Sequence, residues 1–88
     1  MEIIFTRQAA KDFDLIKQNP VLLKKSIALL ELIEDNPFAN PPSFEKLIGF
    51  ECVYLRRIDM QHRLVYQVYE DKNIVKIIRM WTHYEGIK

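Results

Sequence analysis

The sequence predicts a single α+β domain, residues 1–88, in which two N-terminal helices pack on one face of a sheet of about four mostly antiparallel strands. Its 88 residues suffice for one hydrophobic core. The first half contains two stretches with the hydrophobic spacing of helices, and the second half contains three short strand-like stretches separated by polar turns. Helical patterns followed by a run of strands favour helices gathered on one side of an antiparallel sheet.

The N-terminal half is expected to form one strand and two helices. Residues 2–5 are rich in β-branched and aromatic side chains, which is typical of a strand. Thr6 is a suitable N-cap for a helix over about residues 7–18, where apolar side chains recur at intervals of three and four. The Asn-Pro pair at 19–20 ends this helix and starts a second one over about residues 21–35, because proline is tolerated in the first helical turn.

The C-terminal half is expected to form an antiparallel meander. Residues 36–43 contain three of the four prolines, so this segment cannot continue a helix and forms a semi-rigid connector. Residues 52–58, 62–69 and 73–81 have strand-like composition, and the short polar stretches between them suit hairpin turns.

Side-chain alternation in the middle strand predicts which residues share a face. Alternate residues from 64 to 68 are apolar and suit the helix-covered core, so Arg63 should lie on the opposite, open face. If Ile58 pairs with His62 across the turn, Arg57 lies directly opposite Arg63 on that face. Two like charges in this arrangement repel each other unless an anion lies between them, which hints at a phosphate site.

Composition excludes several classes of function. The chain has only two glycines, so it contains no glycine-rich nucleotide-binding loop. Its single cysteine, Cys52, cannot form an internal disulfide or a multi-cysteine metal site, and suits a reducing compartment. No apolar stretch approaches membrane-spanning length. We therefore expect a cytoplasmic protein with no membrane partner, no metal ion and no other cofactor.

The charges are distributed unevenly along the chain. Residues 1–45 contain five Lys or Arg and seven Asp or Glu, whereas residues 46–88 contain eight and five. The basic surplus of the second half weakly favours an anionic partner.

A set of acid-base and cationic residues remains as candidates for chemistry. Each also has an ordinary interpretation without chemistry. The glutamate can be a solvated loop carboxylate, the arginines can line a solvated sheet face, and the His-Tyr pair can be a frayed chain end. From spacing alone both interpretations stay open. The candidates are Glu45, Arg56, Arg57, His62, Arg63, His83 and Tyr84.

The run R-R-I-D-M-Q-H-R-L-V-Y at residues 56–66, together with the His-Tyr pair at 83–84, resembles the YoeB/Txe family of RelE-like toxins. The likeness extends over nearly the whole chain, including an Asn-Pro-Phe connector and a Glu-x-Leu motif. It implies a RelE-like fold related to microbial ribonucleases, and a toxin of a toxin-antitoxin system that cleaves messenger RNA in the A site of the 70S ribosome. It also implies a cognate antitoxin of the YefM or Axe kind, and leaves a homodimer open.

The resemblance further implies roles for the matching residues. Glu45 would take the proton from a ribose 2′-hydroxyl, which attacks the adjacent phosphate, and Arg63 would stabilise the charge that develops there. His83 would protonate the leaving 5′-oxygen, and Tyr84 would help to place the substrate. One base, one acid and a guanidinium suffice for this reaction without a metal. Additional RNA phosphate contacts are expected from Lys46, Arg56 and Arg57.

A protein that works by binding alone is the alternative. It would be a RelE-like toxin directed at another protein, or an antitoxin-bound co-repressor. The joint presence of Glu45, Arg63 and His83 favours the enzyme, because a binding protein needs neither the base nor the acid. The chain departs from the family at Ile48, where a lysine is common, and in residues 85–88, which extend past the usual His-Tyr terminus.

Overall fold

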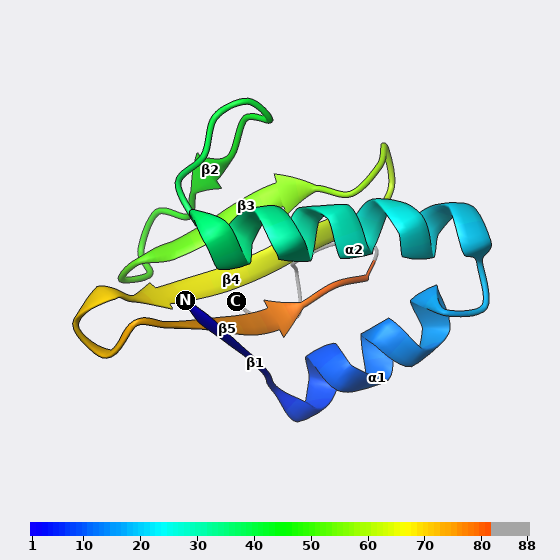
Figure 1. The fold of residues 1–88 in the computed structure, drawn as a ribbon, viewed down its shortest axis with the longest axis horizontal. Coiled ribbons are helices and arrows are strands. Elements are labelled where there is room, and N and C mark those ends of the chain that lie inside the picture. Colours follow the sequence, from blue (N-terminus) through cyan, green and yellow to red (C-terminus); the bar gives the residue numbers. More distant parts are fainter. Residues whose placement is uncertain (82–88) are drawn as a thin grey trace.

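The protein, described here over residues 1–81 by a computed structural model, is built from two helices and a five-stranded sheet (Figure 1). The strand order is β1-β5-β4-β3-β2, with β1 parallel to β5 and all other neighbours antiparallel. The elements are β1 Glu2–Phe5, α1 Arg7–Ile16, α2 Pro20–Asp35, β2 Glu45–Lys46, β3 Val53–Arg57, β4 Arg63–Tyr69, the short 3-10 helix Glu70–Lys72, and β5 Ile74–Arg79.

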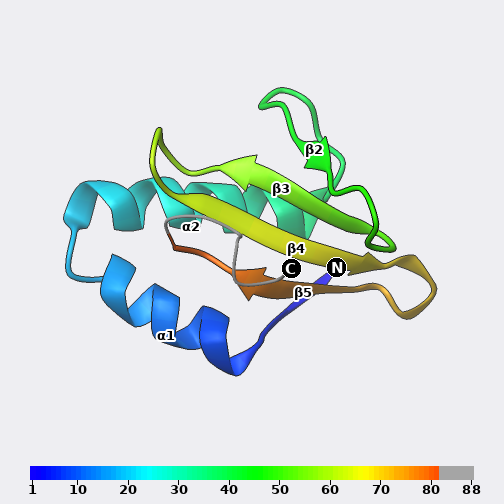
Figure 2. The same cartoon turned by 180° about the vertical axis from the view of Figure 1, so that it is seen from behind.

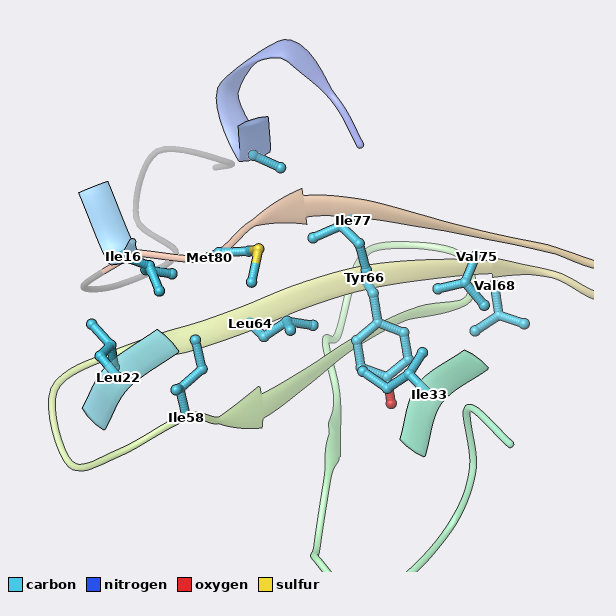
Figure 3. Close-up of a cluster of buried hydrophobic side chains, with 11 residues drawn as sticks. Ile16, Leu22, Ile33, Ile58, Leu64, Tyr66, Val68, Val75, Ile77 and Met80 are labelled. Atoms are coloured by element: carbon cyan, nitrogen blue, oxygen red, sulfur yellow. The ribbon is translucent and has the colours of Figure 1, made fainter. Parts of the chain in front are cut away.

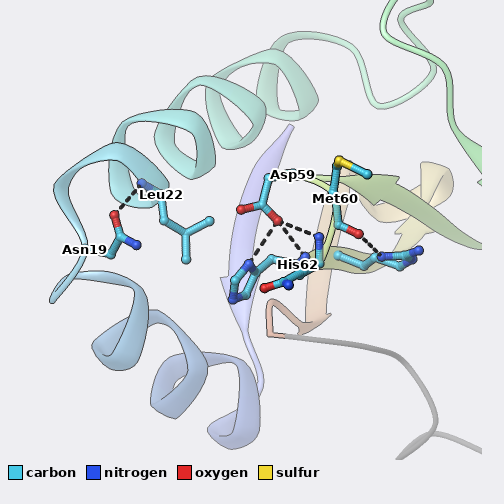
Figure 4. Close-up of polar contacts among 7 residues, drawn as sticks. Asn19, Leu22, Asp59, Met60 and His62 are labelled. Atoms are coloured by element: carbon cyan, nitrogen blue, oxygen red, sulfur yellow. Dashed lines mark hydrogen bonds and ion pairs between the residues drawn. The ribbon is translucent and has the colours of Figure 1, made fainter.

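The predicted fold class is confirmed, with one strand more than expected. Residues 45–46 form β2, which extends the sheet edge beside β3. Both predicted helix caps are also present. The Thr6 side chain accepts a hydrogen bond from the Ala9 N–H at 3.0 Å, and Asn19 accepts one from the Leu22 N–H at 3.1 Å (Figure 4). Such caps stabilise a helix by about 1 kcal/mol each.

The main core lies between the helices and one face of the sheet (Figure 3). Ile16 from α1 and Ile33 from α2 are fully buried there against Leu64, Tyr66 and Val68 of β4, as the alternation of β4 predicts. No helix among residues 1–81 is both long and apolar enough to cross a bilayer.

The opposite face of the sheet, which we call the open face, carries no helix among the described residues. Seen from behind, β3 and β4 lie in front of α2 (Figure 2). A small apolar cluster covers the middle of this face, formed by Val53 and Leu55 of β3 and Val65 of β4 with Leu47 and Ile78 against them. Polar residues at the ends of these strands are therefore held on a rigid platform.

Candidate functional site

Glu45 and Arg57 face the same shallow pocket on the open face. Glu45 is paired with Leu55 across β2 and β3, and residues directly opposite in an antiparallel pair share a face. Arg57 lies two residues beyond Leu55 and therefore points to the same side. The pocket has a volume of about 120 Å³, and its lining residues are Pro42, Ser43, Phe44, Glu45, Leu55 and Arg57.

Arg63 lies next to this pocket, on the neighbouring strand. The predicted register is confirmed, because Arg57 pairs with Arg63 and the Ile58 N–H donates to the His62 carbonyl at 2.8 Å. Within residues 1–81 neither arginine makes an ion pair. Two guanidinium groups thus extend from opposed positions about 5 Å apart at their Cβ atoms. An anion bound between them would relieve their repulsion, and a phosphate suits guanidinium groups in charge and shape.

The hairpin turn before Arg63 is organised by Asp59. Its Oδ1 accepts from the Gln61 N–H at 2.9 Å and the His62 N–H at 2.7 Å, and lies 2.9 Å from the His62 ring Nδ1 (Figure 4). Burial acts to raise the pKa of Asp59, but the hydrogen bonds from Gln61 and His62 outweigh it and lower that pKa. The turn that delivers Arg63 is therefore braced by a charged side chain.

The end of β5 is held beside Arg63. The Arg63 N–H donates to the Trp81 carbonyl at 2.8 Å, and the Trp81 ring meets the His62 ring edge-on at 4.7 Å between centroids. His83 and Tyr84 lie outside the described residues, so the acid and placement roles that the family resemblance implies for them remain predictions.

Lys46 is not brought together with Glu45. It pairs with Tyr54, which packs against the helix-covered core, and it therefore projects from the other side of β2. Adjacent residues of a strand point to opposite faces, so Glu45 and Lys46 cannot both line the pocket. A phosphate contact through Lys46 would involve a different surface.

Arg56 lies elsewhere than the sequence analysis expected. Its side chain is buried on the helix side of β3, with 1% of its surface exposed. The guanidinium donates to the carbonyls of Pro37, Ala39 and Pro42 and to the Tyr66 hydroxyl. Burial raises the pKa of that hydroxyl, although the hydrogen bond from Arg56 acts in the opposite sense. Arg56 is therefore not on the surface that a phosphate would approach, which corrects its grouping with Arg57.

Sequence reasoning also missed residues that build the site without reacting. Pro42, Ser43 and Phe44 form one wall of the pocket, and only their position just before Glu45 signals this. Asp12 lies on the apolar face of α1 and is buried, with its carboxylate bound to Arg79 and to the Met80 N–H. Its helical spacing from apolar residues was an available signal.

Among residues 1–81, no three His, Cys, Asp or Glu side chains are grouped as a metal site.

Comparison with known proteins identifies the family. A family model for the YoeB-like toxin of bacterial type II toxin-antitoxin systems matches residues 5–84. This chain belongs to that family. The YoeB-like toxin described here is thus a toxin of a type II toxin-antitoxin system, as the resemblance in residues 56–66 predicts. No curated protein sequence matches it.

Solved structures agree with the family. A YoeB-YefM complex from Staphylococcus aureus matches with 36% identity and a TM-score of 0.80, covering 96% of this chain and 98% of that one. A YoeB/ParE toxin from Agrobacterium tumefaciens matches with 26% identity and a TM-score of 0.87, covering 96% and 100%. A chain of the Escherichia coli RelBE toxin-antitoxin complex matches with 22% identity and a TM-score of 0.76, covering 96% of this chain and 98% of that one. It shares the fold, so the RelE-like architecture is confirmed.

Proposed function

We propose that this YoeB-like toxin is an endoribonuclease that cleaves messenger RNA in the A site of the 70S ribosome. The observation that carries the proposal is the grouping on the open face of one carboxylate, Glu45, with two arginines, Arg57 and Arg63. A carboxylate beside paired guanidinium groups provides a base next to a phosphate site, and these are two of the elements that RNA cleavage by a 2′-hydroxyl requires.

The reaction proceeds by internal attack within the RNA chain. Glu45 accepts the proton of the ribose 2′-hydroxyl, and the 2′-oxygen forms a bond to the adjacent phosphorus. The bond from phosphorus to the 5′-oxygen of the next nucleotide breaks, which leaves a 2′,3′-cyclic phosphate on one fragment. The departing oxygen takes a proton to become a 5′-hydroxyl, and the family resemblance assigns that donation to His83. Arg57 and Arg63 stabilise the negative charge that builds on the phosphoryl oxygens.

The open face also holds the reacting side chains in fixed positions. The pocket residues are fixed by strand pairing over an apolar cluster, so the base and the guanidinium groups approach the RNA from a rigid surface. Preorganised charge of this kind contributes more to rate than mobile side chains do, because little reorganisation accompanies the reaction. Tyr84 is assigned to substrate placement on the basis of the family resemblance alone.

The proposed partners follow from the family. The S. aureus relatives are described as a YoeB-YefM complex and as a YoeB dimer. We therefore propose that an antitoxin of the YefM or Axe kind inhibits this toxin in the cytoplasm, and that the free toxin forms a homodimer. The ribosome supplies the messenger RNA, and no further cofactor takes part.

Primer extension on a defined message in a purified translation system tests the proposal. We expect breaks in the coding region with wild-type toxin when ribosomes are present, and none without them. Glu45→Gln should reduce cleavage by about 10²- to 10⁴-fold, the usual cost of losing a general base. Glu51→Gln is the matched control, because Glu51 is an exposed glutamate outside the pocket. Full toxicity without any break in the message would instead indicate a toxin that acts by binding.

A further inference from the structure

Arg56 is a buried cation whose partners are main-chain carbonyls. Its Nη1 donates to the Pro42 carbonyl at 2.8 Å, and its Nη2 donates to the carbonyls of Ala39 at 2.8 Å and Pro37 at 3.1 Å. Its Nε donates to the Tyr66 hydroxyl at 3.0 Å, and that hydroxyl donates to the Pro37 carbonyl at 2.8 Å. Within residues 1–81 no carboxylate pairs with this guanidinium.

Burying a cation in this way costs free energy of folding, which is unusual for a contact that only stabilises the fold. A buried charge without a counter-ion is unfavourable unless polar groups surround it closely, and an apolar side chain of similar size fills the same space without that cost. A planar guanidinium, however, holds several acceptors in one fixed geometry, which no apolar side chain does. Here it gathers three carbonyls of the proline-rich connector, residues 36–43, around one point.

The connector leads through Phe44 to the proposed base. The Arg56 guanidinium lies 4.8 Å from the centroid of the Phe44 ring, and that ring meets Tyr54 edge-on at 5.7 Å. Phe44 directly precedes Glu45, and β2 is only two residues long at the edge of the sheet. Phe44 also packs against Phe38 at 6.3 Å between ring centroids, so this buried network holds the chain before Glu45 while the pairing of β2 with β3 holds Glu45 itself.

Three consecutive residues of β3 therefore act on the same site from two sides. Leu55 pairs with Glu45 and Arg57 lines its pocket on the open face, while Arg56 binds the connector on the helix side. We propose that Arg56 is a positioning residue, whose buried guanidinium fixes the proline-rich connector and thereby the place of Glu45 opposite the paired Arg57 and Arg63. The inference rests on the proposed role of Glu45 as the base.

A positioning role predicts a loss of rate with little loss of binding. In Arg56→Lys a single ammonium replaces the planar fork, so the connector loses part of its anchor while the charge is kept. Displacement of a catalytic group by about 1 Å costs up to about 100-fold in rate. We expect the single-turnover rate on programmed ribosomes to fall by about 10- to 100-fold at saturating toxin, with the half-saturating concentration nearly unchanged. Arg7→Lys, an exposed arginine of α1, is the control and should cleave as the wild type does.

A double substitution shows whether Arg56 acts through Glu45. If it does, Arg56→Lys causes no further loss of rate in a Glu45→Gln background, because the group it positions is already gone. Tyr66→Phe, which removes one hydroxyl from the same network, should lower the rate in the same way and serves if Arg56→Lys does not fold. In Arg56→Lys and in Tyr66→Phe, amide hydrogen exchange should be faster over residues 36–47 and unchanged in β4 and β5.

Different outcomes overturn different statements. A wild-type rate in both Arg56→Lys and Tyr66→Phe, or an equal loss of rate with and without Glu45, shows that Arg56 only stabilises the fold. Faster exchange throughout the sheet leads to the same conclusion. A wild-type rate in Glu45→Gln, in contrast, rejects Glu45 as the base, and the inference about Arg56 is then rejected together with the proposed function.

Discussion

Asp12 is expected to make a large polar contribution to the stability of this toxin. It is 1% exposed on the core side of α1, and its Oδ2 accepts from Arg79 Nε at 2.9 Å and from the Met80 N–H at 3.0 Å. Its Oδ1 accepts from the Gln8 side-chain amide at 3.1 Å. These contacts join α1 to the end of β5, 67 and 68 residues away in sequence.

The size of the effect follows from these contacts. Hydrogen bonds to a charged group contribute about 1.5–3 kcal/mol each, and removing one partner of a buried ion pair costs about 3–5 kcal/mol. We expect Asp12→Ala to lower the free energy of unfolding by about 3–5 kcal/mol. Asp12→Asn should cost about 2–3 kcal/mol, because the amide oxygen still accepts from the Met80 N–H while the amide N–H₂ faces another donor, Arg79. A domain of this size has only about 5–10 kcal/mol in total.

Urea unfolding followed by circular dichroism measures this loss. With a slope of about 1 kcal/mol/M for a small domain, Asp12→Asn should lower the midpoint by about 2–3 M. Asp14→Asn is the control in the same helix. Asp14 is 75% exposed and pairs with Lys17 only at 3.6 Å, so its loss should cost less than about 0.5 kcal/mol. Equal midpoints for Asp12→Asn and Asp14→Asn would refute the reasoning.

Three further predictions concern other parts of the molecule. Burial acts to raise the pKa of Asp59, but the hydrogen bonds that its carboxylate accepts hold the folded-state pKa below the ordinary 3.8. The ionised Asp59 side chain therefore contributes stability above pH 3.8, and this contribution is lost as the pH falls through the folded-state pKa. The stability difference between wild type and Asp59→Asn in acid-unfolding curves should therefore shrink below about pH 4, and a constant difference would contradict this. Among residues 1–81 the buried Ser26 hydroxyl has no hydrogen-bond partner, so Ser26→Ala should raise the thermal midpoint slightly rather than lower it. Arg57→Ala and Arg63→Ala should each relieve growth arrest on expression and still co-purify with the antitoxin, whereas continued arrest by both variants would argue against a phosphate site between them.

Local patterns predicted those parts of the fold that neighbours in sequence determine. The caps at Thr6 and Asn19 and the pairing of Arg57 with Arg63 all depend on contacts within a few residues. The short polar turn leaves little freedom of register, and alternation then places each arginine on a face.

The contacts that local patterns missed are long-range or too short to show a period. Strand β2 has two residues, which is too few for alternation to appear. Alternation does turn Arg56 away from the open face once Arg57 is placed there, but its acceptors are carbonyls 14 to 19 residues earlier in the connector. Asp12 and Arg79 likewise meet only in the folded protein. A charged residue at a core-facing position therefore indicates a partner that is distant in sequence. Arg56 and Asp12 both stand at such positions, so this indication was present in the sequence.

A chemically modified message provides the sharpest test of the proposed reaction. The nucleotide whose 2′-hydroxyl would attack is replaced by its 2′-deoxy form at one mapped cleavage position, and the cleavage rate there is compared with the unmodified message on the same ribosomes. Because the 2′-oxygen is the nucleophile that Glu45 activates, we predict loss of cleavage at that position alone, and a 2′,3′-cyclic phosphate end on the unmodified product. Cleavage of the deoxy-substituted message at an unchanged rate would contradict the mechanism, and with it the role of Glu45 on the open face.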